Sequence, residues 1–400
     1  MPSRLSILGQ DAPATSSGSV VWQTAFRPFF LGAAGFGVLV MGVWMAILEG
    51  WLAWPTPLAP FPWHGHELIF GFALAVVAGF LLTASQVWTG LPTVSGLSLV
   101  AIFVIWAAAR FAGFFATATP LVPALLNVAV PLTIAVVIGR PIVRARSGRN
   151  VPFILLLLVM AGACALVWSD ALGWTGHTAS RALWVALDVV LIMIVIVGGR
   201  IIPMFTRNAT GAKVRPKRAL DVLGPASLAL LAVGHAALDP MSAVVAVTAV
   251  VAGVLNLARL VGWGGALALR TPFVGVLHAG YGFVAIGLLL EGGGVLGGVE
   301  AAHLGRHVMA VGGVALMSLG MMTRVSLGHT GRPLHPPRST KLLYGALIVA
   351  TVARFLASLF PGAAFTLWWV AAAAFAAGFF GFIVTYASVL LSPRADGKPG

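Results

Sequence analysis

The stretch Trp63-His64-Gly65-His66-Glu67 opens an apolar segment that continues to about Ala84. It places three ionisable side chains beside residues that are mostly Leu, Ala, Val, Phe and Gly. Ionisable groups inside a membrane-spanning segment are costly and usually functional. The stretch therefore predicts a membrane-spanning helix with a candidate site at its polar end.

A second copy of this segment lies later in the chain. A shift of 241 residues places 66–92 over 307–333 without a gap, and both copies end in the pattern T-G-x-P. Internal repeats usually reflect the architecture of a fold, so the two histidines that open the copies are expected to be structurally equivalent. The identical pairs are His66 and His307, Gly71 and Gly312, Gly79 and Gly320, Ser85 and Ser326, Thr89 and Thr330, Gly90 and Gly331, and Pro92 and Pro333.

The composition is that of a polytopic membrane protein. Of the 400 residues, 60% are hydrophobic and only 8% are charged, whereas a soluble domain carries about 25% charged residues. The net charge of +14 comes from basic residues in short loops between apolar runs, which indicates membrane topology rather than nucleic-acid binding. The single cysteine, Cys164, excludes an intrachain disulfide and a thiolate metal cluster.

Apolar runs of about 20 residues, the length needed to cross a bilayer, predict an all-α fold of about twelve transmembrane helices. Short connections indicate one membrane domain, residues 26–391, between a flexible cytoplasmic N-terminal segment, 1–25, and a cytoplasmic tail, 392–400. The first 25 residues lack the apolar core of a cleavable signal peptide. The expected helices are 29–49, 64–84, 96–115, 121–140, 152–170, 180–199, 219–237, 241–261, 271–290, 302–323, 341–360 and 364–391.

Lys and Arg residues predict the orientation of these helices. They gather in the loops that follow the even-numbered helices, such as 140–149, 200–218 and 324–341, and are scarce in the opposite loops. Because basic loops stay in the cytoplasm, both termini are predicted to be cytoplasmic. The end of the second helix that carries His64 and His66 then faces outward.

The repeat relates the second and tenth helices, and a weaker echo lies on the sixth, where Met204-Phe205-Thr206-Arg207 resembles Met321-Met322-Thr323-Arg324. This spacing predicts three parallel four-helix units around a pseudo-threefold axis. It resembles the catalytic subunit of heme-copper oxidases, in which the second and tenth helices hold heme ligands. The analogy concerns the fold only, because the tyrosine and paired-histidine patterns of those oxidases are missing here.

His66 and His307 are the first candidates for metal ligands. They lie at matching depth on repeat-related helices, and imidazole is the usual axial ligand of heme b and a good ligand for copper. They are predicted to bind the two faces of one heme or to give one ligand each to neighbouring metals; the alternative is that each bonds a nearby carbonyl. His64 either binds a second metal or lies among lipid headgroups, and His303 is expected to face water.

Other histidines have more open roles. His278 lies near the middle of the ninth predicted helix with Tyr281 almost one turn further on, and is either a copper or heme ligand or a buried structural residue. His329 is either a loop anchor or part of a second site. The remaining histidines are expected to be solvated in loops: His177, His235 and His335.

Charged residues within the predicted spans suggest supporting roles. Arg110 and Arg354 occupy similar positions 244 residues apart, and arginine binds carboxylates through a planar fork. They are predicted to lie near heme propionates or, alternatively, to extend toward lipid phosphates. Glu67 is a candidate for orienting an imidazole or carrying a proton, and Glu67 and Tyr281 are the candidate catalytic residues. Asp188 is expected to pair with an arginine.

Several blocks of the chain strongly resemble the NnrS family, over about residues 22–390. The resemblance implies a bacterial inner-membrane protein that contains heme and copper and is associated with nitric oxide metabolism and resistance to nitrosative stress. The histidines of the family motifs correspond here to His64, His66, His278, His307 and His329, whereas His303 lies outside the pattern. The matching blocks are Phe26-Arg27-Pro28-Phe29-Phe30, Trp63-His64-Gly65-His66-Glu67, Gly199-Arg200-Ile201-Ile202-Pro203-Met204-Phe205-Thr206, Leu277-His278-Ala279-Gly280-Tyr281, Met322-Thr323-Arg324 and Gly328-His329-Thr330-Gly331-Arg332.

The leading hypothesis is therefore a heme b and copper protein in nitric oxide defence, with His66 and His307 as heme ligands and His278 or His64 as a copper ligand. The expected partners are nitric oxide or a related small ligand and membrane lipid, with no nucleic acid. Whether the protein acts as an oxidoreductase on nitric oxide is left open, because the sequence shows no recognisable site for an electron donor. The alternatives are a transporter of a metal or metal-nitrosyl species and a heme-based nitric oxide sensor or heme-delivery protein.

Overall fold

The computed structural model describes residues 19–52, 56–115, 120–298 and 302–398. Within these ranges the regular structure is entirely helical, and 12 helical segments are long and apolar enough to cross a membrane. Helices are the expected solution, because a chain in lipid must satisfy its backbone hydrogen-bonding groups internally. The predicted all-helical class and number of spans are confirmed. Residues 1–18 of the predicted N-terminal segment lie outside the described ranges.

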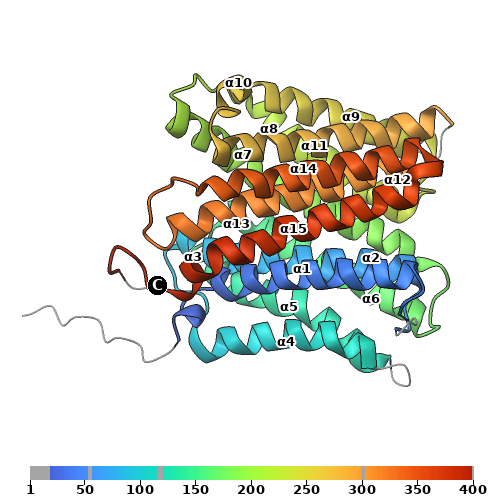
Figure 1. The fold of residues 1–400 in the computed structure, drawn as a ribbon, viewed down its shortest axis with the longest axis horizontal. Helices are drawn as coiled ribbons and strands as arrows, with labels where there is room; N and C mark the ends of the chain where they lie inside the picture. Colours follow the sequence, from blue (N-terminus) through green and yellow to red (C-terminus); the bar gives the residue numbers. More distant parts are fainter. Residues whose placement is uncertain (1–18, 53–55, 116–119, 299–301, 399–400) are drawn as a thin grey trace, which may run out of the picture.

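The spans run roughly parallel or antiparallel to one another along the long axis of the molecule (Figure 1). Two of them, the second and the tenth, are continuous runs of three helical pieces. In chain order the spans are α1 (Phe26–Leu48), α2 (Pro60–His66) with η2 (Glu67–Ala73) and α3 (Leu74–Thr89), α4 (Gly96–Phe115), α5 (Leu121–Arg144), α6 (Val151–Ala171), α7 (Thr178–Thr210), α8 (Arg218–Ala237), α9 (Ala243–Val261), α11 (Pro272–Leu296), α12 (Ala302–His307) with η4 (Val308–Ala315) and α13 (Leu316–Gly328), α14 (Arg338–Leu359) and α15 (Ala364–Leu391). The short α10 (Gly265–Ala268) precedes α11.

The second, sixth and tenth spans form the interior of the bundle together with α11. In their most apolar stretches 67%, 56% and 78% of the residues are buried, and α11 reaches 67%, whereas the other spans reach only 28–44%. The sixth span, α7, packs against both η2 and η4. The internal repeat relates the second and tenth of these spans, and its weaker echo falls on the sixth, so all three are among the four spans shielded most from lipid.

The second and tenth spans share a local distortion. Each contains a π-helical segment, η2 beginning at Glu67 and η4 at Val308, directly after His66 and His307. A π-helical turn widens the helix and is frequent at functional sites. The 241-residue shift found in the sequence also relates the starts of these two segments.

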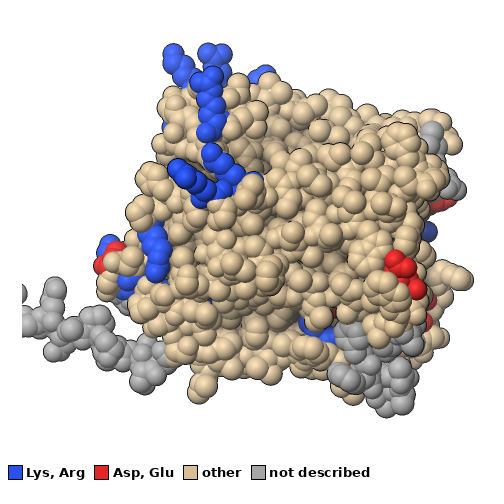
Figure 2. All heavy atoms as spheres, in the orientation of Figure 1, with Lys and Arg blue, Asp and Glu red and all other residues tan. Residues whose placement is uncertain are grey.

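Charge is distributed unevenly over the two ends of the bundle. Figure 2 shows the Lys and Arg side chains gathered mainly at the end where the C-terminus lies, with acidic side chains visible at the other end. We call the first the basic end; its loops follow α5, α7 and α13. We call the other the histidine end, since His64, His66 and His307 lie near it. The cytoplasmic location of the basic end stays a prediction.

Candidate functional site

His66 anchors a buried polar network at the histidine end of the second span. Its Nδ1 lies 2.8 Å from Glu67 Oε1, and the other oxygen, Oε2, accepts a hydrogen bond of 2.8 Å from Arg110 Nη1. The Nε1–H of Trp168 donates to His66 Nε2 at 3.1 Å. His66 is fully buried, and Glu67 and Arg110 are 4% and 2% exposed. Glu67 therefore orients the imidazole and neutralises the arginine.

The remaining contacts of Arg110 fix it in place. Its Nη2 donates to the side-chain oxygen of Asn127, whose amide nitrogen in turn donates to two backbone carbonyls, of Ala109 and Pro123. Gly71 provides space for the guanidinium, because a Cβ there would lie 3.1 Å from Arg110 Nη1. In this arrangement the charge of Arg110 is balanced by Glu67, which makes the predicted role beside a heme propionate less favourable for this arginine.

His307 belongs to a different group of side chains. Its Nδ1 lies 2.8 Å from the carbonyl oxygen of His303, and its Nε2 lies 3.2 Å from Arg354 Nη2. His64 and Arg354 both interact electrostatically with His307. His66 of the second span has other partners, since it points toward Trp168 of α6.

His64 has an unusual environment for a polar ring. It stacks on Trp44 with ring centroids 4.5 Å apart, and its Nδ1 is buried without a hydrogen-bond partner. His64, rather than His66, is therefore the histidine of the second span that interacts electrostatically with His307. The reason is helical geometry: residues two apart on a helix point in nearly opposite directions. Their roles as metal ligands stay predictions.

Three histidines share a hydrogen-bonding pattern that presents Nε2. The Nδ1 atoms of His66, His278 and His307 each face an acceptor oxygen, from Glu67, Val274 and His303 respectively. Nδ1 is therefore the protonated nitrogen, and the lone pair lies on Nε2. Metal-binding histidines usually have this arrangement, in which one ring nitrogen donates to a neighbour and the other faces the metal.

Of these three Nε2 atoms, that of His278 is the one without a hydrogen bond. The residue is 4% exposed, and its Nε2 makes no hydrogen bond of acceptable geometry although the Trp263 backbone lies nearby. His278 is the seventh residue of α11, whose N-terminus lies at the basic end. It is therefore separated along the bundle from the histidine end, and the structure does not bring it together with His64 and His307.

Tyr281 is held by a network of its own. Its hydroxyl donates to Asn256 Oδ1 at 2.6 Å and accepts from Arg259 Nη1 at 3.0 Å, while Arg259 Nε donates to Asp221 Oδ1 at 2.9 Å. The ring also packs against Trp263 with centroids 4.6 Å apart. Its candidate catalytic role stays a prediction, but in this conformation the hydroxyl is committed to structural bonds.

His329 lies outside the spans, at the basic end. Its ring packs against Phe26 with centroids 5.7 Å apart, and its carbonyl oxygen accepts a hydrogen bond of 2.8 Å from Arg394 Nη1. Burial and the nearby Arg394 charge lower the pKa of His329 below its ordinary value of 6.5. A hollow of about 210 Å³, lined also by Thr24 and Gln86, lies beside it. These contacts suit the loop-anchor interpretation.

Sequence reasoning missed a buried ionic cluster on four helices. His235 was expected to be solvated in a loop, but it is 1% exposed, with Nδ1 2.6 Å from Asp188 Oδ2 and Nε2 3.5 Å from Glu291 Oε1. Arg306 Nη2 lies 3.2 Å from the same Glu291 oxygen, and its guanidinium lies over the ring of Trp184. Asp188 thus pairs with a histidine rather than with the expected arginine.

The signal for this cluster was weak in the sequence. Glu291 and His235 stand near the ends of their helices, where polar residues are ordinary at a membrane surface. Only the packing of α7, α8, α11 and α12 shows that they face one another. The four charges balance when His235 carries a proton, since two carboxylates then face two cations.

The second, sixth and tenth spans therefore each carry a polar group that bonds to a basic side chain on the span that follows it. These pairs are Glu67 with Arg110, Asp188 with His235, and His307 with Arg354. Within the described residues, no three His, Cys, Asp or Glu side chains converge as a metal-binding group.

The family model described as NnrS protein matches residues 20–394, nearly the whole chain. The chain belongs to the NnrS family. Membership fits a membrane protein related to nitric oxide, and the match includes every NnrS-motif histidine discussed above. No curated protein matches the chain.

Proposed function

We propose that this NnrS protein binds heme b and copper in the bacterial inner membrane and acts in nitric oxide metabolism and resistance to nitrosative stress. The observation that carries the proposal is a pair of imidazole nitrogens, His64 Nδ1 and His278 Nε2, that are buried without a hydrogen-bond partner. Leaving a buried polar atom unsatisfied costs about 1–3 kcal/mol. A bound metal would remove that cost, and imidazole is the common protein ligand for heme iron and copper.

The residues present at the histidine end fit a heme better than a bare metal ion. His64 and His307 offer imidazoles from two different spans, and Arg354, 3.2 Å from His307 Nε2, is suited to a heme propionate. Its guanidinium has no carboxylate partner among the described residues, unlike that of Arg110. Heme held by these residues would supply one-electron redox chemistry and would bind nitric oxide at its iron where one of the two imidazoles gives way.

The copper site is assigned to His278. Its Nδ1 donates to Val274 O at 3.1 Å, which holds the ring and directs the Nε2 lone pair into the protein. His66 is the alternative heme ligand from the sequence repeat. For His66 to bind a metal, Trp168 must turn away from Nε2, because it now donates a hydrogen bond to that atom.

The test is an absorption spectrum and metal analysis of detergent-purified protein, oxidised and reduced, with and without nitric oxide. A b-type spectrum that shifts with nitric oxide is expected, together with bound copper. His64→Ala and His307→Ala should lose the heme spectrum, and His278→Ala should lose copper and keep heme. The exposed His177→Ala is the matched control.

Three results discriminate among the ligand assignments. Loss of heme in His66→Ala and His307→Ala but not in His64→Ala would favour the repeat pair from the sequence. Full heme and copper in the alanine variants of all four proposed ligands, His64, His66, His278 and His307, would overturn the assignments. A colourless wild-type protein after heme-replete expression would contradict the heme proposal and favour a transporter.

A further inference from the structure

The hollow beside His329 lies at the basic end, where several distant stretches of the chain meet. Its lining comes from the start of α1, the end of α3, the loop before α4 and the segments that follow α13 and α15. Phe26 and His329, which pack against each other in it, belong to two of the sequence blocks that resemble the NnrS family. More than half of the lining side chains carry hydrogen-bonding groups. The hollow is therefore suited to a polar ligand.

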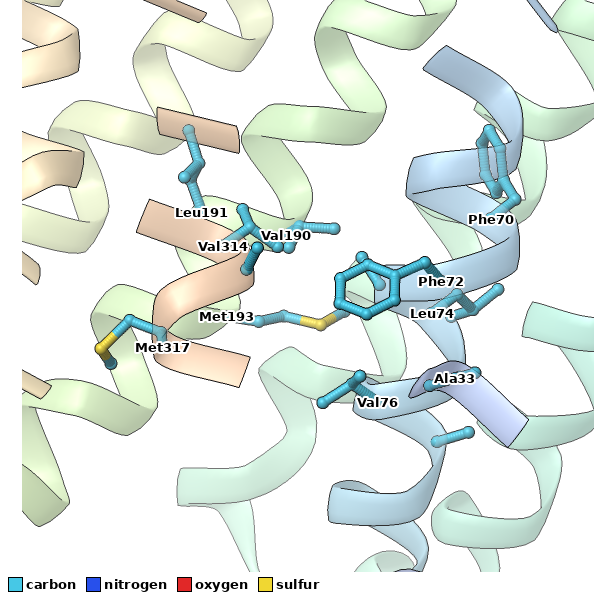
Figure 3. Close-up of a cluster of buried hydrophobic side chains, with 14 of the residues drawn as sticks. Ala33, Phe70, Phe72, Leu74, Val76, Val190, Leu191, Met193, Val314 and Met317 are labelled. Atoms are coloured by element: carbon cyan, nitrogen blue, oxygen red, sulfur yellow. The ribbon is translucent and has the colours of Figure 1, made fainter. Parts of the chain in front are cut away.

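The interior of the bundle beside α3 has the opposite character. Figure 3 shows Val76 of α3, Met193 of α7 and Val314 of η4 in a cluster of buried hydrophobic side chains. A charged group placed among such side chains would lose its hydration without compensation. A charged ligand that binds beside α3 is therefore expected at an end of the bundle.

Arg27 brings a buried positive charge close to the hollow. The residue is fully buried, and its Nη1 donates to the carbonyl oxygens of Leu390 and Ser392 at 2.8 Å each. Its Nε donates at 3.2 Å to the hydroxyl of Thr24, which lines the hollow, whereas Nη2 is buried without a partner. Nε and Nη2 form one edge of the guanidinium, and arginine binds oxyanions through such a planar fork. The edge that faces Thr24 is therefore only half occupied.

Two further arginines leave this region short of negative charge. Arg332 and Arg394 both repel Arg27 electrostatically, and Arg394 lines the hollow. In the part of the chain that the structure describes, Asp396 is the one acidic residue that forms an ion pair with any of the three, through Arg394 Nη2 at 2.6 Å. Three guanidinium groups therefore face a single carboxylate, and an anion in the hollow would offset the excess.

We propose that this hollow binds the phosphate group of an anionic phospholipid headgroup. Basic pockets between membrane-spanning helices on the cytoplasmic side are typical sites for anionic headgroups, and the basic end is predicted to be cytoplasmic. Val87 of α3 lines the hollow and is 70% exposed, so an acyl chain can leave the site along the outer face of that span. The proposal does not depend on heme or copper, because the proposed metal ligands do not line the hollow.

The test is lipid binding by the detergent-purified full chain, measured by native mass spectrometry. Phosphatidylglycerol, which is anionic, should bind more tightly than phosphatidylcholine, whose phosphate is balanced by a cationic choline. Arg332→Gln should weaken phosphatidylglycerol binding about fivefold, the contribution of one basic side chain near an anionic lipid. The fold should tolerate this change, since Arg332 makes one long hydrogen bond of 3.5 Å to the Thr330 carbonyl. Arg207→Gln, at an exposed position near the end of α7, removes the same charge elsewhere and should leave binding unchanged.

Asp396→Asn should act in the opposite direction. Asp396 accepts hydrogen bonds from both Nε and Nη2 of Arg394, the edge that a phosphate would use, so its removal should strengthen phosphatidylglycerol binding. Equal binding of the two lipids, or an equal loss in Arg332→Gln and Arg207→Gln, would overturn the proposal. Millimolar inorganic phosphate should not displace the lipid; displacement would show a site for free phosphate and overturn the lipid assignment.

Discussion

Replacing Arg110 by methionine tests whether the buried network around His66 holds the second span in place. The substitution keeps most of the apolar stem but removes the guanidinium, which donates to both Glu67 and Asn127. Glu67 would then be left as a buried carboxylate, with His66 as its remaining hydrogen-bonded partner. We expect a strong loss of stability, because a single unpaired charge in the bundle interior is costly.

The size of the effect follows from the contacts. Hydrogen bonds to charged groups contribute about 1.5–3 kcal/mol each, so the two acceptors of Arg110 together give about 3–6 kcal/mol. Breaking a buried ion pair by removing one partner costs about 3–5 kcal/mol. The two estimates overlap at about 3–5 kcal/mol, which corresponds to a change of more than 100-fold in the folded-to-unfolded ratio.

The assay is unfolding in mixed micelles with increasing sodium dodecyl sulfate, followed by tryptophan fluorescence. Arg181→Met is the matched control, since that arginine is exposed and makes one long hydrogen bond of 3.4 Å to Ala236; it should change stability by about 0.5 kcal/mol or less. The double variant Glu67→Gln with Arg110→Met should be less destabilised than the sum of the single variants. A loss below about 1 kcal/mol in Arg110→Met, or full additivity, would refute the reasoning.

Three further predictions concern other parts of the chain. His235→Ala should destabilise the bundle by about 3 kcal/mol or more in the same unfolding assay. The reason is that Glu291 and Asp188 would then face one remaining cation, Arg306. An unfolding curve identical to that of the wild-type protein would show that the cluster contributes nothing to stability. Gly312→Leu should cost about 1–3 kcal/mol by overpacking, since a Cβ there would lie 2.6 Å from a phenylalanine of α11, and an unchanged midpoint would contradict that packing. The Arg394 guanidinium lowers the pKa of Asp396 from 3.8 to about 2, so the ion pair contributes above pH 3.8 and is lost as the pH falls through about 2. A carbon-13 titration should therefore show that Arg394→Gln raises the Asp396 midpoint toward 3.8, and an unmoved midpoint would count against this pair.

The fold was largely predictable from the sequence because lipid imposes simple rules. Each span needs about 20 apolar residues. The described chain has 12 segments that meet this condition, which is the number that the apolar runs of the sequence predict. The observed span boundaries differ from the predicted ones where a helix continues beyond its apolar stretch. The sixth span, for example, extends through Thr178–Thr210, about three turns beyond its predicted end.

The candidate site was predictable only in part. The sequence identified the histidines that are candidate metal ligands and the arginines that are candidate partners of heme propionates, and the repeat singled out His66 and His307. It could not give the contacts of His307, because the directions in which side chains face on two helices depend on the rotation of the helices and on the π-helical turns that follow the histidines. It also placed His235 in solvent, since hydropathy at a helix end does not distinguish a lipid headgroup region from a contact between helices.

The sequence by itself determined the class of the molecule, the number of its spans and its NnrS membership, because these follow from composition, hydropathy and local motifs. Tertiary structure alone decided the partners of several polar side chains: Arg110 with Glu67, His307 with Arg354, and His235 with two carboxylates. Such contacts join residues far apart in the chain, and they depend on the rotation and depth at which whole helices pack, which no local pattern encodes.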